Sequence, residues 1–254
     1  MTLENALGDD AGTNIGRLRE RARSMHIGST ATQPHVRVAI LTQAPQVNLW
    51  RCSLTEMPGA SQMAWLGADE RVRAARFAFE RDRRRYLAAR CALRECLSER
   101  TGMAPGDLQI ESGVFEKPLL ANARGWFFNL SRREDWALIG ISRAGEIGVD
   151  FELLHAVEKV DALALAHFSV AEFDTFQGLP TDSKDRVFLR VWTRKEACLK
   201  AVGTGLRIEP RTLEVGLGEG IVRLAISLPT GAASVEVRSV DSGPDSVAAI
   251  ARLL

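Results

Sequence analysis

The stretch from Phe188 to Leu206, FLRVWTRKEACLKAVGTGL, carries charged side chains on what its spacing predicts to be an amphipathic helix. Lys195 falls near the middle of the apolar stripe of that helix, where an ammonium group is costly unless an anion lies beside it. The stripe consists of Phe188, Val191, Trp192, Leu199 and Val202. The sequence therefore predicts an anionic partner for Lys195, and Gly203 and Gly205 predict the end of the helix.

Glu196 and Lys200 lie one turn apart at the edge of the same stripe. Side chains at this spacing are neighbours on a helix, and they often form nothing more than a surface ion pair. They could also act together on one small ligand bound between this helix and its neighbour. The position of Lys195 favours the second interpretation, a binding or catalytic site.

Two more carboxylates, Asp150 and Glu152, lie in a predicted strand, residues 147–153. Because side chains alternate along a strand, both carboxylates point to one face. They repel each other unless water solvates them or a divalent cation, which prefers oxygen ligands, holds them together. The Asp-x-Glu spacing alone leaves a solvated face and a metal site both open.

A local excess of positive charge lies between Arg71 and Arg100, where ten arginines stand against four acids. The pattern predicts either a solvated helix face or a groove for phosphate groups or an acidic partner protein. The whole chain has 33 basic and 32 acidic residues and a net charge of +1, so it has no general attraction to nucleic acid or anionic membranes. We therefore expect neither nucleic acid nor a membrane among its partners.

The chain has 254 residues, 46% of them hydrophobic and 26% charged, which is enough for one large core or two smaller ones. Its four cysteines include no CxxC pair and no metal-ligand spacing with histidine, as is typical of reduced thiols in a cytoplasm. No apolar run reaches the roughly 18 residues of a membrane span, and the first residues lack the apolar core of a signal peptide. These features predict a protein of the cytoplasm.

The expected order of elements is a β segment, two helices, a β-meander, two helices and a second β-meander, which predicts an α+β fold of two similar halves. We expect a flexible leader at residues 1–34, an N-terminal lobe at residues 35–153 and a C-terminal lobe at residues 154–254. The expected helices are two within residues 63–100, joined near residues 77–79, and one each at 161–177 and 185–202. The expected strands are residues 36–41, 47–54, 108–110, 126–130, 136–141, 147–153, 213–217, 222–228, 235–240 and 247–253, with turns at 131–135 and 143–146.

Three motifs follow one another in the chain. They are Lys117-Pro118 followed by Phe128-Asn129-Leu-Ser131, then Gly148-Val-Asp150-Phe-Glu152, then Trp192-Thr-Arg-Lys195-Glu196-Ala-Cys-Leu-Lys200. Together they resemble the motifs of 4'-phosphopantetheinyl transferases of the larger, surfactin-synthetase-activating (Sfp-like) class. That family's N-terminal signature is matched by Arg76-Phe77, Asp82, Arg85 and Arg94, and the resemblance covers about residues 65–215.

The resemblance implies two pseudo-symmetric α/β lobes, with coenzyme A and Mg²⁺, or Mn²⁺ in its place, in the cleft between them. It implies a monomer that transfers the 4'-phosphopantetheine arm of coenzyme A to a serine of an apo acyl carrier protein or of a peptidyl or polyketide carrier domain, with release of 3',5'-ADP. By the same resemblance the metal ligands would be Asp150, Glu152 and Glu196. Glu196 and Lys200 would be catalytic: Lys200 would help 3',5'-ADP to leave, and Glu196 or water on the metal would take the serine proton. The coenzyme A contacts would be Arg73, Arg85, Arg94, Lys117, Ser131, Arg132, Lys195 and Lys200.

The chain departs from the family at Arg132, where members generally have a histidine after the serine. Arginine also binds phosphate, so the expected contact is retained. From the residues alone, two other functions stay open. One is a metal-dependent nuclease or phosphodiesterase, since such enzymes also hold Mg²⁺ with clustered carboxylates and a lysine. The other is a binding module that uses the basic helices between Arg71 and Arg100 without chemistry.

Overall fold

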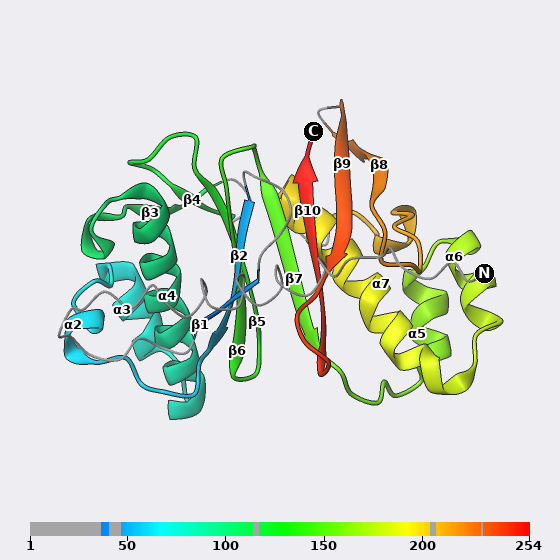
Figure 1. Ribbon diagram of the computed structural model, residues 1–254, viewed down its shortest axis with the longest axis horizontal. Helices are drawn as coiled ribbons and strands as arrows, with labels where there is room; N and C mark the ends of the chain where they lie inside the picture. Colours follow the sequence, from blue (N-terminus) through cyan, green and yellow to red (C-terminus); the bar gives the residue numbers. More distant parts are fainter. Residues whose placement is uncertain (1–36, 41–46, 114–116, 204–206, 230) are drawn as a thin grey trace, which may run out of the picture. The chain divides into compact units, whose positions relative to one another are not determined.

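The computed structural model describes residues 37–40, 47–113, 117–203, 207–229 and 231–254 (Figure 1). They belong to one unit of the chain, His35–Leu254. This unit is a mixed α/β structure with several sheets. The predicted leader, residues 1–34, and the second predicted helix stop, Gly205, lie outside the described residues. No helix in the described ranges is long and apolar enough to cross a membrane.

The N-terminal part is built on a four-stranded antiparallel sheet with the order β1-β2-β6-β5. Helix α4 (Glu80–Thr101) covers one face of this sheet through a core that includes Leu93 and Leu97 of the helix and Phe128 and Ile139 of the sheet. The strands are β1 (Arg37–Ile40), β2 (Val47–Ser53), β5 (Phe127–Arg133) and β6 (Trp136–Ser142). The remaining elements are α2 (Ala60–Met63), α3 (Ala68–Ala75), η1 (Pro105–Asp107), β3 (Ile110–Ser112) and β4 (Pro118–Leu120).

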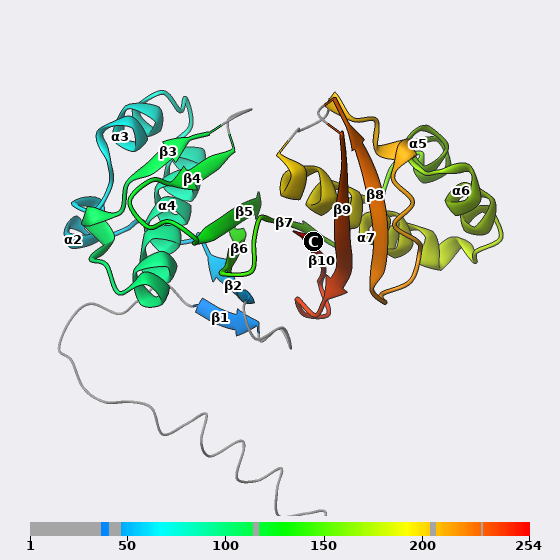
Figure 2. The ribbon, with the colours of Figure 1, turned by 90° about the horizontal axis from the view of Figure 1, so that it is seen from above.

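The C-terminal part is built on a second antiparallel sheet with the order β7-β10-β9-β8. Helix α7 (Thr181–Val202) covers one face, and Gly203 ends it with a φ of 73°, as the sequence predicted. The strands are β7 (Ile147–Leu153), β8 (Val222–Leu228), β9 (Gly231–Val240) and β10 (Ser246–Leu253). The remaining helices are α5 (Val160–His167), α6 (Val170–Gln177) and the short η4 (Pro210–Thr212). Figure 2 shows α2–α4 beside the first sheet and α5–α7 beside the second.

The two sheets contact each other through the faces that their helices leave uncovered. Leu49 and Leu138 of the first sheet share a buried cluster with Val149 and Phe151 of the second. Gly140 allows this contact, because a methyl group there would lie 2.8 Å from the Val149 Cγ1 atom and 3.0 Å from the Ile147 side chain. The strand β7 is therefore buried on both faces, by α7 and by the first sheet.

The expected meander over residues 126–153 is only partly correct. Strands β5 and β6 form the predicted hairpin, but β7 pairs along its length with β10 and not with β6. Residues 143–146 thus connect the two sheets. Local turn signals cannot reveal a strand partner that lies about a hundred residues further along the chain. The limits of the two lobes stay a prediction, and a boundary after Leu153 would divide the second sheet.

The expected strand at residues 213–217 is absent from this described segment, although Val215 is fully buried. Side chains take the hydrogen bonds of its backbone in place of a neighbouring strand. The Val215 N–H donates to Glu172 Oε1 at 2.7 Å, and Arg194 Nε donates to the Val215 carbonyl at 3.0 Å. An apolar run that is bonded in this way needs no sheet.

Several other bounds differ from the expectation, and two of these differences are described here. The helix predicted at residues 161–177 is broken into α5 and α6 by Ser169, whose hydroxyl caps α6 by accepting from the Glu172 N–H at 3.2 Å. Strand β5 runs on through Arg133, so Ser131 and Arg132 are strand residues, and the turn follows at Glu134, which has a φ of 50°. Because neighbours in a strand point to opposite faces, Ser131 and Arg132 face opposite sides of the sheet.

Candidate functional site

The acidic cluster, defined here as Asp150, Glu152 and Glu196, forms where β7 meets α7. Gly148 explains how close the two elements come, since a Cβ atom there would lie 2.1 Å from the Ala197 carbonyl oxygen. Asp150 and Glu152 follow Gly148 at alternate positions of β7 and therefore share its face, toward α7. The helix contributes Glu196 from its turn nearest to Gly148.

Lys200 and Ser131 tie this cluster to the first sheet. Lys200 Nζ lies 2.6 Å from Asp150 Oδ1 and donates to Ser131 Oγ at 3.2 Å. The Ser131 hydroxyl donates to the same Asp150 oxygen at 2.8 Å. One carboxylate oxygen thus joins β5, β7 and α7, and the structure brings together five of the residues that the sequence singled out.

The charges of neighbouring carboxylates contribute to the pKa shifts of Glu196 and Glu152. Burial raises the pKa of Glu196 above its ordinary value, the charge of Asp150 raises it further, and Lys200 opposes the shift. Burial likewise raises the pKa of Glu152, against the opposing charge of Arg133 and together with that of Asp150. The cluster is therefore a site where anions are crowded and partly shielded from water, which favours a bound cation.

Each member of the acidic cluster keeps one buried oxygen that accepts no hydrogen bond within the described residues. These atoms are Asp150 Oδ2, Glu152 Oε2 and Glu196 Oε1. Within the described part of the chain, Glu152 Oε2 has only an ion-pair contact, with Arg133 Nε at 2.9 Å. Buried carboxylate oxygens without hydrogen-bond donors are rare, and oxygen atoms of this kind are the ligands that Mg²⁺ prefers. In the described ranges no three acidic, histidine or cysteine side chains are already arranged around a common metal position. The donor set fits a divalent cation, and the side chains would have to turn to bind one.

Lys195 lies elsewhere, although it precedes Glu196. Its side chain is 0% exposed, and its ammonium group lies 2.6 Å from Glu172 Oε2 and donates to the carbonyls of Pro210 and Leu213. The anionic partner that the sequence predicted therefore exists, but it is a protein carboxylate. Three acceptors use the three donors of the ammonium group, so the arrangement does not support the expected contact with coenzyme A.

Arg94 and Arg85 are also occupied by protein groups. Arg94 is 3% exposed, and its guanidinium donates to Glu70 Oε2 at 2.9 Å and to the Pro105 carbonyl at 2.8 Å. It links α3, α4 and η1 and has no open side toward a ligand. Arg85 is more accessible but donates to Asp135 Oδ1 at 2.9 Å. Neither residue lies in the acidic cluster.

Lys117 joins the two halves of the described chain at the end of α7. Its ammonium group lies 2.6 Å from Glu146 Oε2 and donates to the carbonyls of Ile147 at 3.2 Å and Ala201 at 2.8 Å. Burial lowers the pKa of Lys117, and the Glu146 carboxylate opposes that shift. The lysine fixes the start of β7 against α7, and so acts on the cluster through the backbone.

Arg132 lies on the opposite face of β5 from Ser131, in a second group that we name the arginine cluster: Arg73, Arg90 and Arg132. The guanidinium groups of Arg73 and Arg132 each lie 5.7 Å from the ring centroid of Tyr86. Desolvation lowers the pKa of Arg132, and the like charges of Arg73 and then Arg90 lower it further. Arg90 is already paired with Glu70, whereas the like charges of Arg73 and Arg132 over one ring suit an anion such as phosphate.

Two residues of the site, Asn129 and Arg133, were not among the expected site residues. Asn129 Oδ1 accepts from the Val149 N–H at 2.9 Å, and Arg133 Nε lies 2.9 Å from Glu152 Oε2. Both share the face of Ser131 because they are two residues from it in the same strand. Had the strand been predicted to continue past residue 130, this alternation would have identified them.

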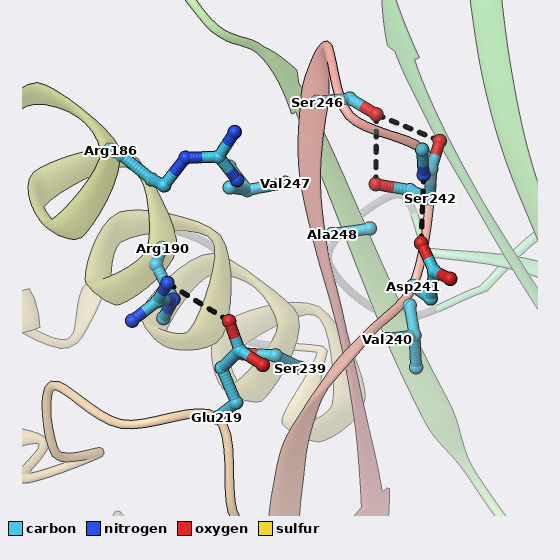
Figure 3. Close-up of a pocket in the computed structure, with 11 residues that line it drawn as sticks. Arg186, Arg190, Glu219, Ser239, Val240, Asp241, Ser242, Ser246, Val247 and Ala248 are labelled. Atoms are coloured by element: carbon cyan, nitrogen blue, oxygen red, sulfur yellow. Dashed lines mark hydrogen bonds and ion pairs between the residues drawn. The ribbon is translucent and has the colours of Figure 1, made fainter.

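The pocket in Figure 3 lies away from this chemistry, between α7 and the turn from β9 to β10. It measures ≈ 300 Å³, and its lining includes Arg186, Arg190, Ser242 and Ser246 but no member of the acidic cluster. Arg190 is paired with Glu219 at 3.0 Å, and the Ser242 and Ser246 hydroxyls bond each other at 2.9 Å. Its polar groups are largely satisfied by one another, so we do not place the site there.

Fold and site together define a mixed α/β protein with one group of side chains suited to a divalent cation and another suited to phosphate. Residues 146–251 match the model of the 4'-phosphopantetheinyl transferase superfamily, and residues 48–143 match that of the 4'-phosphopantetheinyl transferase N-terminal domain. The chain is 36% identical over 166 residues to the 4'-phosphopantetheinyl transferase HetI of Nostoc sp., which covers 63% of this chain and 70% of that protein. It is 26% identical over 167 residues to the 4'-phosphopantetheinyl transferase ffp of Bacillus subtilis, covering 66% of this chain and 73% of the relative. The chain belongs to the 4'-phosphopantetheinyl transferase superfamily.

Proposed function

We propose that this enzyme transfers the 4'-phosphopantetheine arm of coenzyme A to a serine of an apo acyl carrier protein, or of a peptidyl or polyketide carrier domain, in a Mg²⁺-dependent reaction that releases 3',5'-ADP. Family membership supports the transfer. The observation that carries the metal requirement is the acidic cluster, in which each carboxylate keeps a buried oxygen that accepts no hydrogen bond within the described residues.

Asp150, Glu152 and Glu196 would hold Mg²⁺, or Mn²⁺ in its place. When bound, such an ion offsets the negative charge that gathers on phosphoryl oxygens during transfer. Lys200 lies 2.6 Å from Asp150 and carries a positive charge at the same place. Its ammonium group donates to the phosphate oxygens that gain charge as 3',5'-ADP leaves.

In this reaction the serine oxygen bonds to the phosphorus that carries the pantetheine arm, and the bond from that phosphorus to 3',5'-ADP breaks. The proton of the serine hydroxyl goes to Glu196 or to water. Ser131, through its bond to Asp150, keeps that carboxylate turned toward β5 and Lys200. This part of the site therefore mainly positions groups and balances charge, as phosphoryl transfer requires.

The 3'-phosphate of coenzyme A would bind at the arginine cluster. The guanidinium groups of Arg73 and Arg132 both lie 5.7 Å from the ring centroid of Tyr86. Ser131 and Arg132 are adjacent, so β5 would carry contacts to both ends of an elongated ligand. Lys195 and Arg94, which are buried on protein acceptors, receive structural roles in this proposal.

The two sheets, each with its long helix, would be the two pseudo-symmetric lobes of the family. The sheet order favours a division between Ser142 and Ile147, and the cleft for coenzyme A would lie where β5 approaches β7. We further propose that the enzyme works as a monomer in the cytoplasm.

The test is to incubate the protein with coenzyme A, MgCl₂ and an apo acyl carrier protein, and to weigh the carrier by mass spectrometry. A mass gain of one phosphopantetheine is expected, with loss of the gain in Asp150→Asn and in Glu196→Gln. Glu158→Gln, which changes an exposed acid, is the matched control and should act normally. No gain with any apo carrier would overturn the transfer, and full activity of both site variants would overturn the metal assignment.

A further inference from the structure

Strand β7 lies beside β5 without sharing a backbone ladder with it (Figure 1). Alternate side chains of β5 reach across to β7. Asn129 accepts from the Val149 N–H at 2.9 Å, and Ser131 donates to Asp150 at 2.8 Å. The next residue on this face, Arg133, places Nε 2.9 Å from Glu152 Oε2. The row of side chains therefore ends in a guanidinium group directly beside a carboxylate of the acidic cluster.

Arg133 is held loosely. Its side chain is 41% exposed and that of Glu152 is 17% exposed, so the cation lies at the rim and the anion further in. The contact has the distance of an ion pair, yet neither Arg133 Nε nor Glu152 Oε2 has a hydrogen-bond partner within the described residues. A partly exposed pair that lacks a hydrogen bond is held less firmly than a fully buried one, so the guanidinium group can leave when another anion binds it.

The charges around the acidic cluster are nearly balanced before any metal arrives. Lys200 lies against Asp150 and Arg133 against Glu152, so two cations face three carboxylates. A divalent cation that enters this site meets two positive groups already in place, and each of them opposes its binding. The reaction proposed above gives Lys200 a role but gives none to Arg133.

We propose that Arg133 is a built-in counter-ion of Glu152 that weakens metal binding until a phosphate of coenzyme A draws it away. The side chain of Arg133 is 41% exposed, so its guanidinium group can bind phosphate oxygens when a ligand approaches. Metal and coenzyme A then bind with positive coupling, because the phosphate removes the charge that opposes the metal. This inference rests on the proposed function, specifically on the metal assignment.

The test measures Mn²⁺ binding to the purified full chain by electron paramagnetic resonance, first without coenzyme A. Arg133→Gln should bind Mn²⁺ about three- to tenfold more tightly than the wild type, since one opposing charge is gone. Arg133→Lys keeps the charge and should stay close to the wild type. Arg132→Gln removes the same charge from the next residue, on the opposite face, and should leave the Mn²⁺ affinity unchanged.

The second arm repeats the titration with coenzyme A present. The tightening of Mn²⁺ binding by coenzyme A should be smaller in Arg133→Gln than in the wild type. Unchanged or weaker Mn²⁺ binding by Arg133→Gln would overturn the counter-ion proposal and leave the metal assignment standing. If Arg132→Gln bound Mn²⁺ as tightly as Arg133→Gln in the absence of coenzyme A, the cause would be the net charge of the protein, and this result would also overturn the counter-ion proposal. No Mn²⁺ binding in any variant, wild type included, would overturn the metal assignment and this proposal with it.

Discussion

Replacing Lys195 by methionine separates the two roles that this residue could have. Methionine has a similar length and no charge, so it fits the space beside the Pro210 and Leu213 carbonyls but leaves the Glu172 carboxylate without its cation. Breaking a buried ion pair from one side costs about 3–5 kcal/mol. Glu172 keeps hydrogen bonds from the backbone N–H groups of Ser169, Val215 and Gly216, at 2.9, 2.7 and 3.0 Å, so we expect a loss of about 3 kcal/mol. For a chain of this size that lowers the melting temperature by roughly 6–12 °C.

The assay is urea unfolding of Lys195→Met, with coenzyme A binding measured by calorimetry on the folded protein. Lys184→Met makes the same substitution on the same helix, where the partner Asp161 is 63% exposed, and should cost less than about 1 kcal/mol. Adding Glu172→Gln to Lys195→Met should recover part of the loss, since no buried charge is then left unpaired. If Lys195→Met is as stable as the wild type and loses its affinity for coenzyme A, the structural assignment is refuted and the lysine serves the ligand.

Two further predictions concern stability. Gly148→Ala should destabilise the protein by about 3 kcal/mol or displace α7, because the new Cβ would lie 2.1 Å from the Ala197 carbonyl oxygen. Gly59→Ala is the control, since a Cβ there would have no atom within 4 Å. Equal melting temperatures for the two variants would contradict the close approach of β7 and α7. Burial alone would raise the pKa of Glu70, but the charge of Arg90 and further donors lower the pKa below its ordinary value of 4.5. The ionised carboxylate therefore stabilises the fold above pH 4.5, and this stabilisation is lost as the pH falls through the lowered pKa. Glu70→Gln should therefore be less stable at pH 7, and its unfolding free energy, measured by urea titration, should fall less steeply from pH 5 to about 3 than that of the wild type. An equally steep fall in both proteins would contradict the prediction.

The sequence by itself determined the features that depend on neighbours in the chain. Helical spacing and Gly203 located the end of α7, and the alternation in a strand placed Asp150 and Glu152 on one face. The motif around Glu196 led to the family that the comparisons confirm. The requirement for an anion beside Lys195 was also readable, because the cost of a buried charge follows from the apolar positions around it.

Only the tertiary structure decided which groups meet. The anion beside Lys195 is Glu172 from α6, the partner of β7 is β10, and Arg94 is buried on Glu70. Each of these contacts joins segments that are separated in the chain. The sequence around a charged residue is the same whether its partner is a protein group or a ligand. The continuation of β5 through Arg133 is a similar case. Polar residues at the end of a strand predict a turn, and only the pairing with β6 shows that these residues belong to the strand. Spacing fixes which side of an element a residue occupies, whereas the partner on that side is set by how the two sheets and their helices pack.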